Sequence, residues 1–149
     1  RGSVAVSIAG QDIYPAFNNN AYLAPQKCEV DSCNEHVGGG GGQPHLHGDP
    51  FGTFCLYSSL NYTSSTVHPP QIGWSLDGPS IYGRHLSTKN EGYSTPLDDC
   101  GGHVHTGYTY HYHAQVLTST VDNGVAPTQK DQIGTTYYAS TTGPYIVFY

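Results

Sequence analysis

Three pairs of histidines, each separated by one residue, are the strongest chemical signal in the sequence. The pairs are His45/His47, His103/His105 and His111/His113. At this histidine content a random order would give about half of one such pair, so three are an excess. On an extended strand, residues i and i+2 point to the same face, so each pair can present two imidazoles to one cation. Zinc and copper both accept such donors, which predicts a zinc or copper site.

Three aspartates and three unpaired histidines are the other polar side chains to consider. Asp77, Asp98 and Asp99 are candidates for metal ligands or for acceptors that orient an imidazole. An alternative stays open, in which the paired histidines form a buried hydrogen-bonded network without an ion. The three isolated histidines are interpreted as surface or core positions without a function. They are His36, His68 and His85.

Four ordered segments resemble the YHYH-domain family of secreted or surface proteins. They are residues 44–52 (PHLHGDPFG), 76–83 (LDGPSIYG), 97–103 (LDDCGGH) and 110–114 (YHYHA). The resemblance runs from residue 43 to about residue 116 and implies a family-defining polar set, which we take as the metal-ligand hypothesis. That set is His45, His47, His103, His111, His113, Asp77 and Asp98. The resemblance implies no particular reaction.

The four cysteines predict two disulfides in a secreted protein. Disulfides are typical of oxidising compartments, and no C-x-x-C pair favours a zinc site instead. Three pairings are possible. The short turn between Cys28 and Cys33 favours a local bridge, which leaves Cys55 with Cys100, and the family resemblance also implies a Cys55–Cys100 bridge.

Composition excludes two classes of function. Five Lys and Arg against eleven Asp and Glu give a net charge of −6, which argues against nucleic-acid binding. No apolar run approaches the roughly 20 residues of a transmembrane helix. Because the sequence opens on Arg1 without an initiator Met, we expect a processed form or a fragment.

The pattern of apolar residues has mostly a period of two and predicts an all-β fold. We expect one domain over residues 1–149, an antiparallel sandwich or irregular barrel with long loops and two disulfides. The predicted strands cover residues 3–9, 53–60, 109–120, 134–141 and 145–149. The five glycines of residues 38–42 are interpreted as a mobile internal loop.

Residues 1–20 are interpreted as an N-terminal arm that can pair with a neighbouring subunit. Val4, Val6 and Ile8 would form its assembly strand, which adds to the sheet edge of another copy and builds a filament. Asn61, in Asn-Tyr-Thr, is the predicted glycosylation site. The leading hypothesis is therefore an extracellular, self-assembling structural glycoprotein, which is favoured over an enzyme.

Two alternatives belong to other classes. The first is a secreted zinc- or copper-binding protein or metalloenzyme that uses the histidine pairs with an open coordination position. The second is a carbohydrate-binding module with exposed tyrosines and Trp74 as stacking platforms. The motifs of serine hydrolases, P-loop proteins, dinucleotide-binding proteins and zinc proteases are absent from the sequence.

Overall fold

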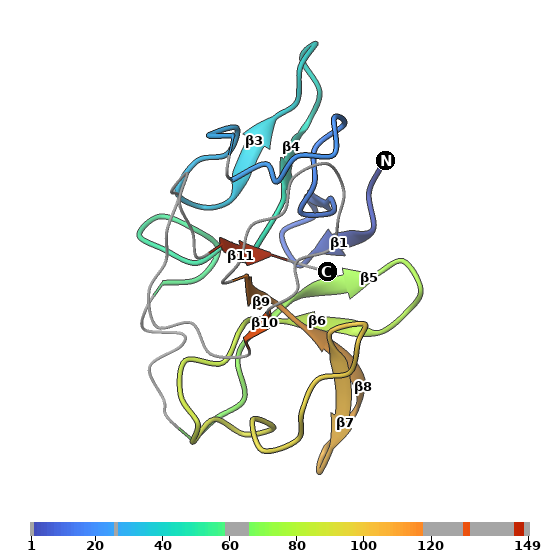
Figure 1. The fold of residues 1–149 in the computed structure, drawn as a ribbon, viewed down its shortest axis with the longest axis vertical. Coiled ribbons are helices and arrows are strands. Elements are labelled where there is room, and N and C mark those ends of the chain that lie inside the picture. The colour runs from blue at the N-terminus through green and yellow to red at the C-terminus, as the bar shows by residue number, and fades with distance from the viewer. Residues whose placement is uncertain (1, 26, 59–65, 118–129, 132–144, 148–149) are drawn as a thin grey trace.

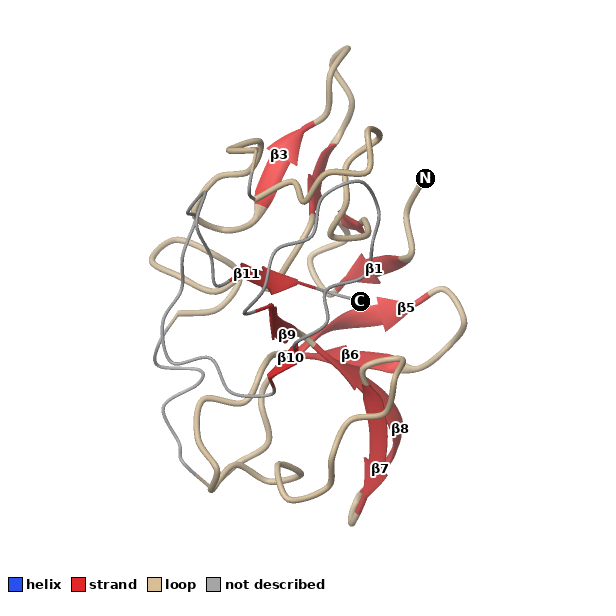
Figure 2. Ribbon diagram, viewed as in Figure 1, coloured by secondary structure: helices blue, strands red, loops and turns tan. Residues whose placement is uncertain are grey.

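Every regular element in the described part of the protein is a β-strand, which confirms the all-β prediction (Figures 1 and 2). The computed structural model describes residues 2–25, 27–58, 66–117, 130–131 and 145–147. The strands are β1 (Ala5–Ser7), β2 (Asp12–Ile13), β3 (Glu35–Val37), β4 (Pro44–Leu46), β5 (Gln71–Ser75), β6 (Ser80–Tyr82), β7 (Gly102–His105), β8 (Tyr108–His113), β9 (Gln115–Leu117), β10 (Lys130–Asp131) and β11 (Tyr145–Val147). Within these ranges, no helix has the length and apolar character needed to cross a membrane.

Eight strands form one open sheet in the order β3-β4-β2-β1-β5-β6-β8-β7, and β10-β9-β11 form a second, smaller sheet. The pairs β2–β4 and β6–β8 are parallel, whereas all other pairs are antiparallel. The large sheet is thus mixed and not closed, unlike the antiparallel sandwich or barrel expected from the sequence. Two hairpins, β3–β4 and β7–β8, form its two edges and lie at opposite ends of the molecule (Figure 1).

Strand β1 lies inside the large sheet, so the N-terminal segment is part of its own domain. One edge pairs with β2 and the other with β5. Gly73 stands opposite Ser7, and a Cβ at residue 73 would collide with the backbone carbonyl of Val6, so β1 and β5 need a glycine there to approach this closely. With both edges paired, residues 3–9 offer no free edge to a neighbouring molecule.

The other predicted strands have mixed outcomes. Strand β9 falls within residues 109–120, β8 begins one residue before that range, and β11 falls within 145–149. Residues 53–58 form turns with one bridge between Phe51 and Tyr57, so the strand predicted over 53–60 is wrong in its described part. Phe54 has φ 70°, a left-handed conformation that ends extended structure. The strand predicted over 134–141 lies outside the described residues.

The structure contains one disulfide, Cys33–Cys55, in place of the two predicted pairings. Cys28 and Cys100 are exposed and carry no disulfide. The carboxylate of Asp31 accepts the backbone N–H groups of Cys33 and Glu35, which forms a tight turn into β3. That turn places Ser32 beside Cys55, so the partner of Cys33 comes from a distant turn and not from Cys28.

The interior contains few aliphatic side chains and many imidazoles. Its main apolar cluster consists of Ala5, Ile13, Leu46, Ile72, Ile81 and Ala114. Seven of the nine histidines are buried, and Arg84, His85, His111 and His113 are among the largest fully buried side chains. Burying a polar ring costs free energy unless its nitrogens have bonding partners. The partners of these imidazoles therefore determine which chemistry the interior can support.

Candidate metal centres

All nine histidines lie in one of two groups. His36, His45 and His47 form the three-histidine site, at the β3–β4 hairpin. The other group, the six-histidine cluster at the β7–β8 hairpin, consists of His68, His85, His103, His105, His111 and His113. Within each group the donor nitrogens form triads whose members lie within 4.8 Å of one another, close enough to hold a metal ion. No histidine is isolated: His36, His68 and His85, which the sequence suggested as lone positions without a function, each belong to one of these triads.

The three-histidine site is a product of the β3–β4 register. His36 stands directly opposite His45, and the alternation along the chain returns His47 to the same side. The glycines of residues 38–42 form the connection of this hairpin, and Gly40 and Gly41 have φ of 92° and 80°, which glycine adopts without strain. The segment interpreted as a mobile loop is thus the turn that brings His36 to His45.

Backbone carbonyls orient all three rings. The Nδ1 atoms of His36, His45 and His47 lie 2.7, 3.0 and 2.6 Å from the carbonyl oxygens of Glu29, Gln43 and Pro15. A carbonyl oxygen can only accept, so each Nδ1 carries the ring hydrogen and donates it. The Nε2 atom of each neutral ring then bears a lone pair.

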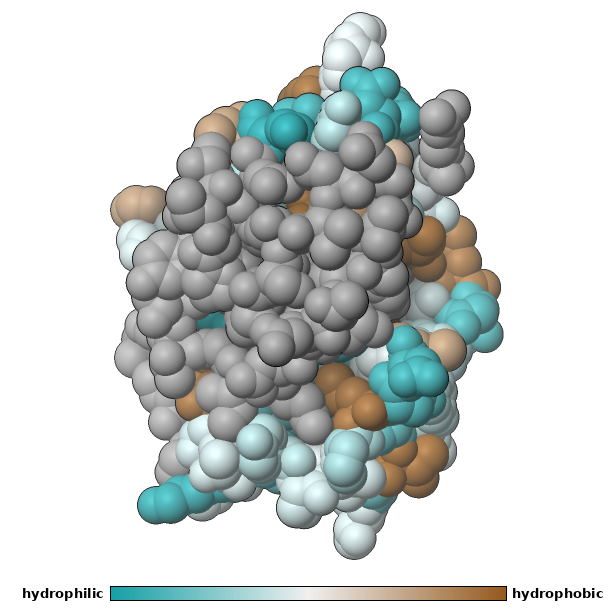
Figure 3. Space-filling model, viewed as in Figure 1, coloured by the Kyte–Doolittle hydropathy of each residue, from teal (hydrophilic) through white to brown (hydrophobic). Residues whose placement is uncertain are grey.

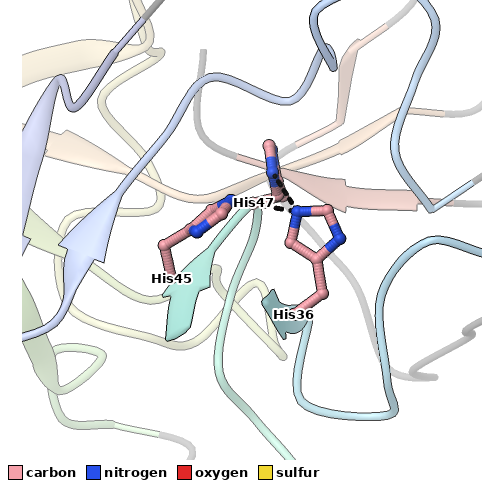
Figure 4. A group of neighbouring side chains, drawn as sticks. All are labelled: His36, His45 and His47. Carbon is pink, nitrogen blue, oxygen red and sulfur yellow. Dashed lines mark hydrogen bonds between the residues drawn. The ribbon is translucent and has the colours of Figure 1, made fainter. Parts of the chain in front are cut away.

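These three lone pairs point at one another. Nε2 of His36 lies 2.9 Å from Nε2 of His45 and 3.1 Å from Nε2 of His47 (Figure 4). With the single ring hydrogen committed at Nδ1, a neutral imidazole has none left to place between two Nε2 atoms. Lone pairs at this separation repel, and a cation between them removes the repulsion. Tetrahedral zinc, bound at about 2.05 Å, would separate its nitrogens by about 3.3 Å, a few tenths more than these gaps.

Burial keeps at least one of these rings neutral. Loss of solvation lowers the pKa of His47 to about 4, against the raising effect of its bond to Pro15, and the neighbouring His36 and His45 lower it further. His47 is therefore uncharged at neutral pH. A neutral imidazole is the form that coordinates a metal.

The three-histidine site lines an open pocket of about 840 Å³. Tyr14 also lines it and stacks on His45 with ring centroids 4.2 Å apart. Phe17 and Glu29 contribute to the wall. An ion held by three imidazoles keeps at least one coordination position for water or a small ligand, and the position here faces the pocket.

The six-histidine cluster also depends on the register of a hairpin, and it gathers more histidines. In the β7–β8 hairpin His103 stands opposite His111, and period-two alternation adds His105 and His113. Gly107, with φ 86°, occupies the turn between the strands. His68 comes from the segment before β5, and His85 from the segment after β6.

Five of these six rings also bind a backbone carbonyl through Nδ1. The acceptors for His68, His103, His105, His111 and His113 are Pro69, Thr95, Thr106, Thr109 and Gly83, at 2.6 to 3.2 Å. Nε2 of His111 lies 3.1 Å from Nε2 of both His68 and His113. Eight of the nine histidines thus share one tautomer, which leaves Nε2 as the donor atom that a metal requires. Metal-ligating histidines in proteins almost always have such a partner on the other nitrogen.

Several nitrogens of the cluster have no hydrogen-bond partner among the described residues. They are both ring nitrogens of His85 and the Nε2 atoms of His103 and His105. His85 is fully buried, with its ring stacked on His113 at 4.5 Å. An unpaired buried polar atom costs about 1–3 kcal/mol, so this cluster is costly in the absence of a partner for these nitrogens.

Burial lowers the pKa of five of the six histidines of the cluster. Loss of solvation lowers the pKa of His68 to about 4 and that of His85 to about 3, and neighbouring histidines add to both effects. The same cause lowers the pKa of His103 and His111, and it lowers that of His113 well below its usual value.

Asp77 and Asp98, which the sequence suggested as ligands, belong to neither group. Their carboxylates accept hydrogen bonds from the hydroxyls of Tyr112 and Tyr110, at 2.7 and 2.9 Å. These bonds raise the pKa of Tyr112 to about 12. Alternation along β8 places the tyrosines on the face opposite the buried His111, so both carboxylates lie on the outer side of the strand.

A buried ion pair links the two centres. Asp49 and Arg84 are both fully buried and paired. Asp49 follows the three-histidine site by two residues, whereas Arg84 precedes His85 directly. The Arg84 guanidinium also lies 4.4 Å from the centroid of the Phe51 ring. This contact holds the segments that supply ligands to both centres.

Sequence reasoning found five of the nine histidines as candidate ligands and missed four. The structure places His45 and His47 in the three-histidine site, and it places His103, His111 and His113 in the six-histidine cluster. His36 could have been found by interpreting the glycine run as a hairpin turn. His105 could have been found from its membership of the His103/His105 pair. His68 and His85 come from irregular segments, for which the sequence holds no periodic signal. Asn61 lies outside the described residues.

No protein-family model, no curated protein and no solved structure compared with the chain matches it. The resemblance to the YHYH-domain family therefore stays a prediction. The function has to be inferred from the geometry of the two histidine groups.

Proposed function

We propose that the protein binds a transition-metal ion, zinc or copper, at the three-histidine site. The observation that carries the proposal is the orientation of the rings. Three Nδ1–H groups donate to backbone carbonyls, so the Nε2 lone pairs of His45 and His47 converge on that of His36, at 2.9 and 3.1 Å. Nitrogen donors of this kind suit zinc and copper better than calcium or magnesium, which prefer oxygen.

The bound ion would have an open coordination position on the pocket side. Three protein ligands and one exchangeable position are typical of zinc sites that act on water or a small ligand. Tyr14 and Phe17 would form the apolar part of the wall around that position. The protein is thus a metal-binding protein in which a pocket gives access to the ion.

Titration of the metal-free chain with zinc(II) and copper(II) tests the proposal. We expect His36→Gln to weaken binding at this site by more than about 100-fold, because it removes a ligand rather than a ligand's own partner. Tyr14→Phe is the matched control, because it keeps the ring against His45 and removes no donor. The proposal is wrong if His36→Gln binds both ions as tightly as the unsubstituted chain.

A second candidate function is self-assembly through the outer face of the large sheet. Val4, Val6 and Ile8 are exposed, and Val6 stands opposite the half-exposed Trp74 on β5. Figure 3 has apolar surface on the side of the molecule where Figure 1 places β1 and β5. Because both edges of β1 are paired, association between copies would use this face and not strand addition.

Sedimentation velocity tests this candidate. We expect the double change Val6→Thr and Ile8→Thr to shift an assembled protein toward the monomer. Val104→Thr, an exposed apolar residue on β7, serves as the control. A monomeric unsubstituted chain at all concentrations would refute it. A filament-forming protein with a disulfide would function outside the cell, where disulfides persist, and a glycan at Asn61 would fit that location.

A further inference from the structure

The six-histidine cluster has more donors than one metal ion can use. A tetrahedral ion takes four ligands, whereas this cluster offers six imidazoles. Its triads are His68/His111/His113, His85/His103/His113 and His103/His105/His111. Any two of them share one histidine, and each shared Nε2 lone pair can bind only one ion because Nδ1 is committed to a carbonyl.

The six donors divide into one triad and a second set of three in which His103 lies near both others. His68, His111 and His113 form the first, with consecutive Nε2 atoms 3.1 Å apart. The second consists of His85, His103 and His105, in which the donor of His103 lies within 4.8 Å of the donors of both others. Every donor nitrogen without a hydrogen-bond partner in the described cluster belongs to the second set. Two ions would therefore use all six rings.

Charge decides which ions the cluster can hold. Five of its six residues are buried, and no carboxylate belongs to any of the metal-sized groups among the described residues. The part of the chain that the structure describes thus supplies no negative ligand to offset the ions. The cost of burying an ion scales with the square of its charge, so a dication costs about four times as much as a monocation. Repulsion between two ions follows the same factor.

We propose that the six-histidine cluster binds a pair of copper(I) ions, independently of the three-histidine site. Copper is a metal that imidazole suits, and in its monovalent state it accepts two or three ligands. The first set matches a three-coordinate ion. The second set matches an ion with two or three ligands, one of which is His103.

Anaerobic titration with copper(I) against a chromophoric copper(I) chelator tests the proposal on the full chain. The reference protein is His36→Gln, in which the three-histidine site is impaired and the cluster is unchanged. We expect it to withdraw two copper(I) ions per chain from the chelator, and X-ray absorption to report nitrogen ligands alone. One equivalent of zinc(II) should not displace them.

Two cluster variants complete the design. In the His36→Gln background, His111→Gln should reduce the stoichiometry from two ions to one or none. If that variant does not fold, His105→Gln at the less buried rim should reduce it from two ions to one. The inference is overturned if His36→Gln alone binds fewer than two copper(I) ions, or if zinc(II) displaces them. Loss of all copper in His36→Gln would place the copper in the three-histidine site, which would leave the proposed function standing.

Discussion

The two edge hairpins of the large sheet both bring histidines together across paired strands, but the two groups differ in size and exposure. In β3–β4 one His-x-His pair faces one cross-strand histidine, and the site opens on a pocket. In β7–β8 one histidine from each of two His-x-His pairs stands opposite the other, His103 against His111, and two further histidines complete the cluster. The first arrangement leaves a coordination position accessible, whereas the second encloses its donors.

The strand register sets the size of each group of histidines that could hold a metal. A single antiparallel register places one imidazole opposite another, and each additional His-x-His pair extends the row along one face. The adjoining loops then determine how exposed each group of histidines is to solvent. The glycine turn of residues 38–42 leaves β4 beside the pocket, whereas the segments carrying His68 and His85 close over β7 and β8.

Breaking the ion pair between the hairpins should have the largest effect. Arg84→Met leaves the buried Asp49 carboxylate without its cation, which should lower the free energy of unfolding by about 3–5 kcal/mol. Because the pair links both ligand-bearing segments, metal affinity should fall at both centres. Urea unfolding and metal titration measure the two effects. Lys89→Met, at an exposed position, is the control, and equal stability of the two variants would contradict the prediction.

Acidification of the metal-free protein should destabilise the β7–β8 hairpin more than the β3–β4 hairpin. The pKa of His85 is about 3 and that of His68 about 4 in the fold, below the usual 6.5. As the pH falls below 6.5, the unfolded chain takes up protons that the folded chain does not, so stability is lost from pH 6.5 down to about 3. One lowered value, that of His47, acts in the three-histidine site and contributes at most about 3 kcal/mol.

Hydrogen exchange between pH 7 and pH 5 measures this difference. We expect the amides of β8 to lose protection before those of β4, because five lowered pKa values act in the six-histidine cluster. Earlier loss of protection in β4 would contradict the comparison.

Gly92→Ala should disturb the six-histidine cluster alone. A Cβ at residue 92 would lie 2.5 Å from Nε2 of His105, and the φ of 86° disfavours a side chain. The variant should lose about 1–3 kcal/mol and displace His105 from the cluster. Gly39→Ala, in the other hairpin, meets no atom within 4 Å and should be nearly neutral. Thermal unfolding compares the two, and equal losses would argue against this packing.

Tyr112→Phe should have the smallest effect. It removes the hydrogen bond to Asp77 at the exposed face of β8, worth about 0.5–1.5 kcal/mol. Metal affinity should not change, because Asp77 lies on the side opposite the histidines. A loss of metal affinity greater than tenfold would restore Asp77 as a candidate ligand.

The sequence predicted the fold class and the chemistry better than the connectivity. Period-two alternation indicated strands, and the His-x-His pairs marked the segments that form β4, β7 and β8, although neither hairpin was expected. The disulfide and the parallel strand pairs depend on contacts between distant segments, which no local pattern encodes. Cys33, for example, finds Cys55 only after the 31–35 turn and the β3–β4 hairpin have formed.

The missed ligands have a similar physical reason. His36 is recruited by a register that depends on a glycine turn, and that turn has the composition of a flexible linker. His68 and His85 are held by carbonyl or stacking contacts in irregular segments. Asp77 and Asp98 were expected near the metal because of their sequence context, yet alternation along β8 turns their tyrosine partners to the outer face.

Anomalous diffraction from crystals of the full chain loaded with zinc or copper tests the central claim most directly. We predict a peak about 2.0–2.1 Å from the Nε2 atoms of His36, His45 and His47, with Nδ1 of each ring still bonded to its carbonyl. A map without this peak, in which the three Nε2 atoms turn away to protein or water partners, would contradict it.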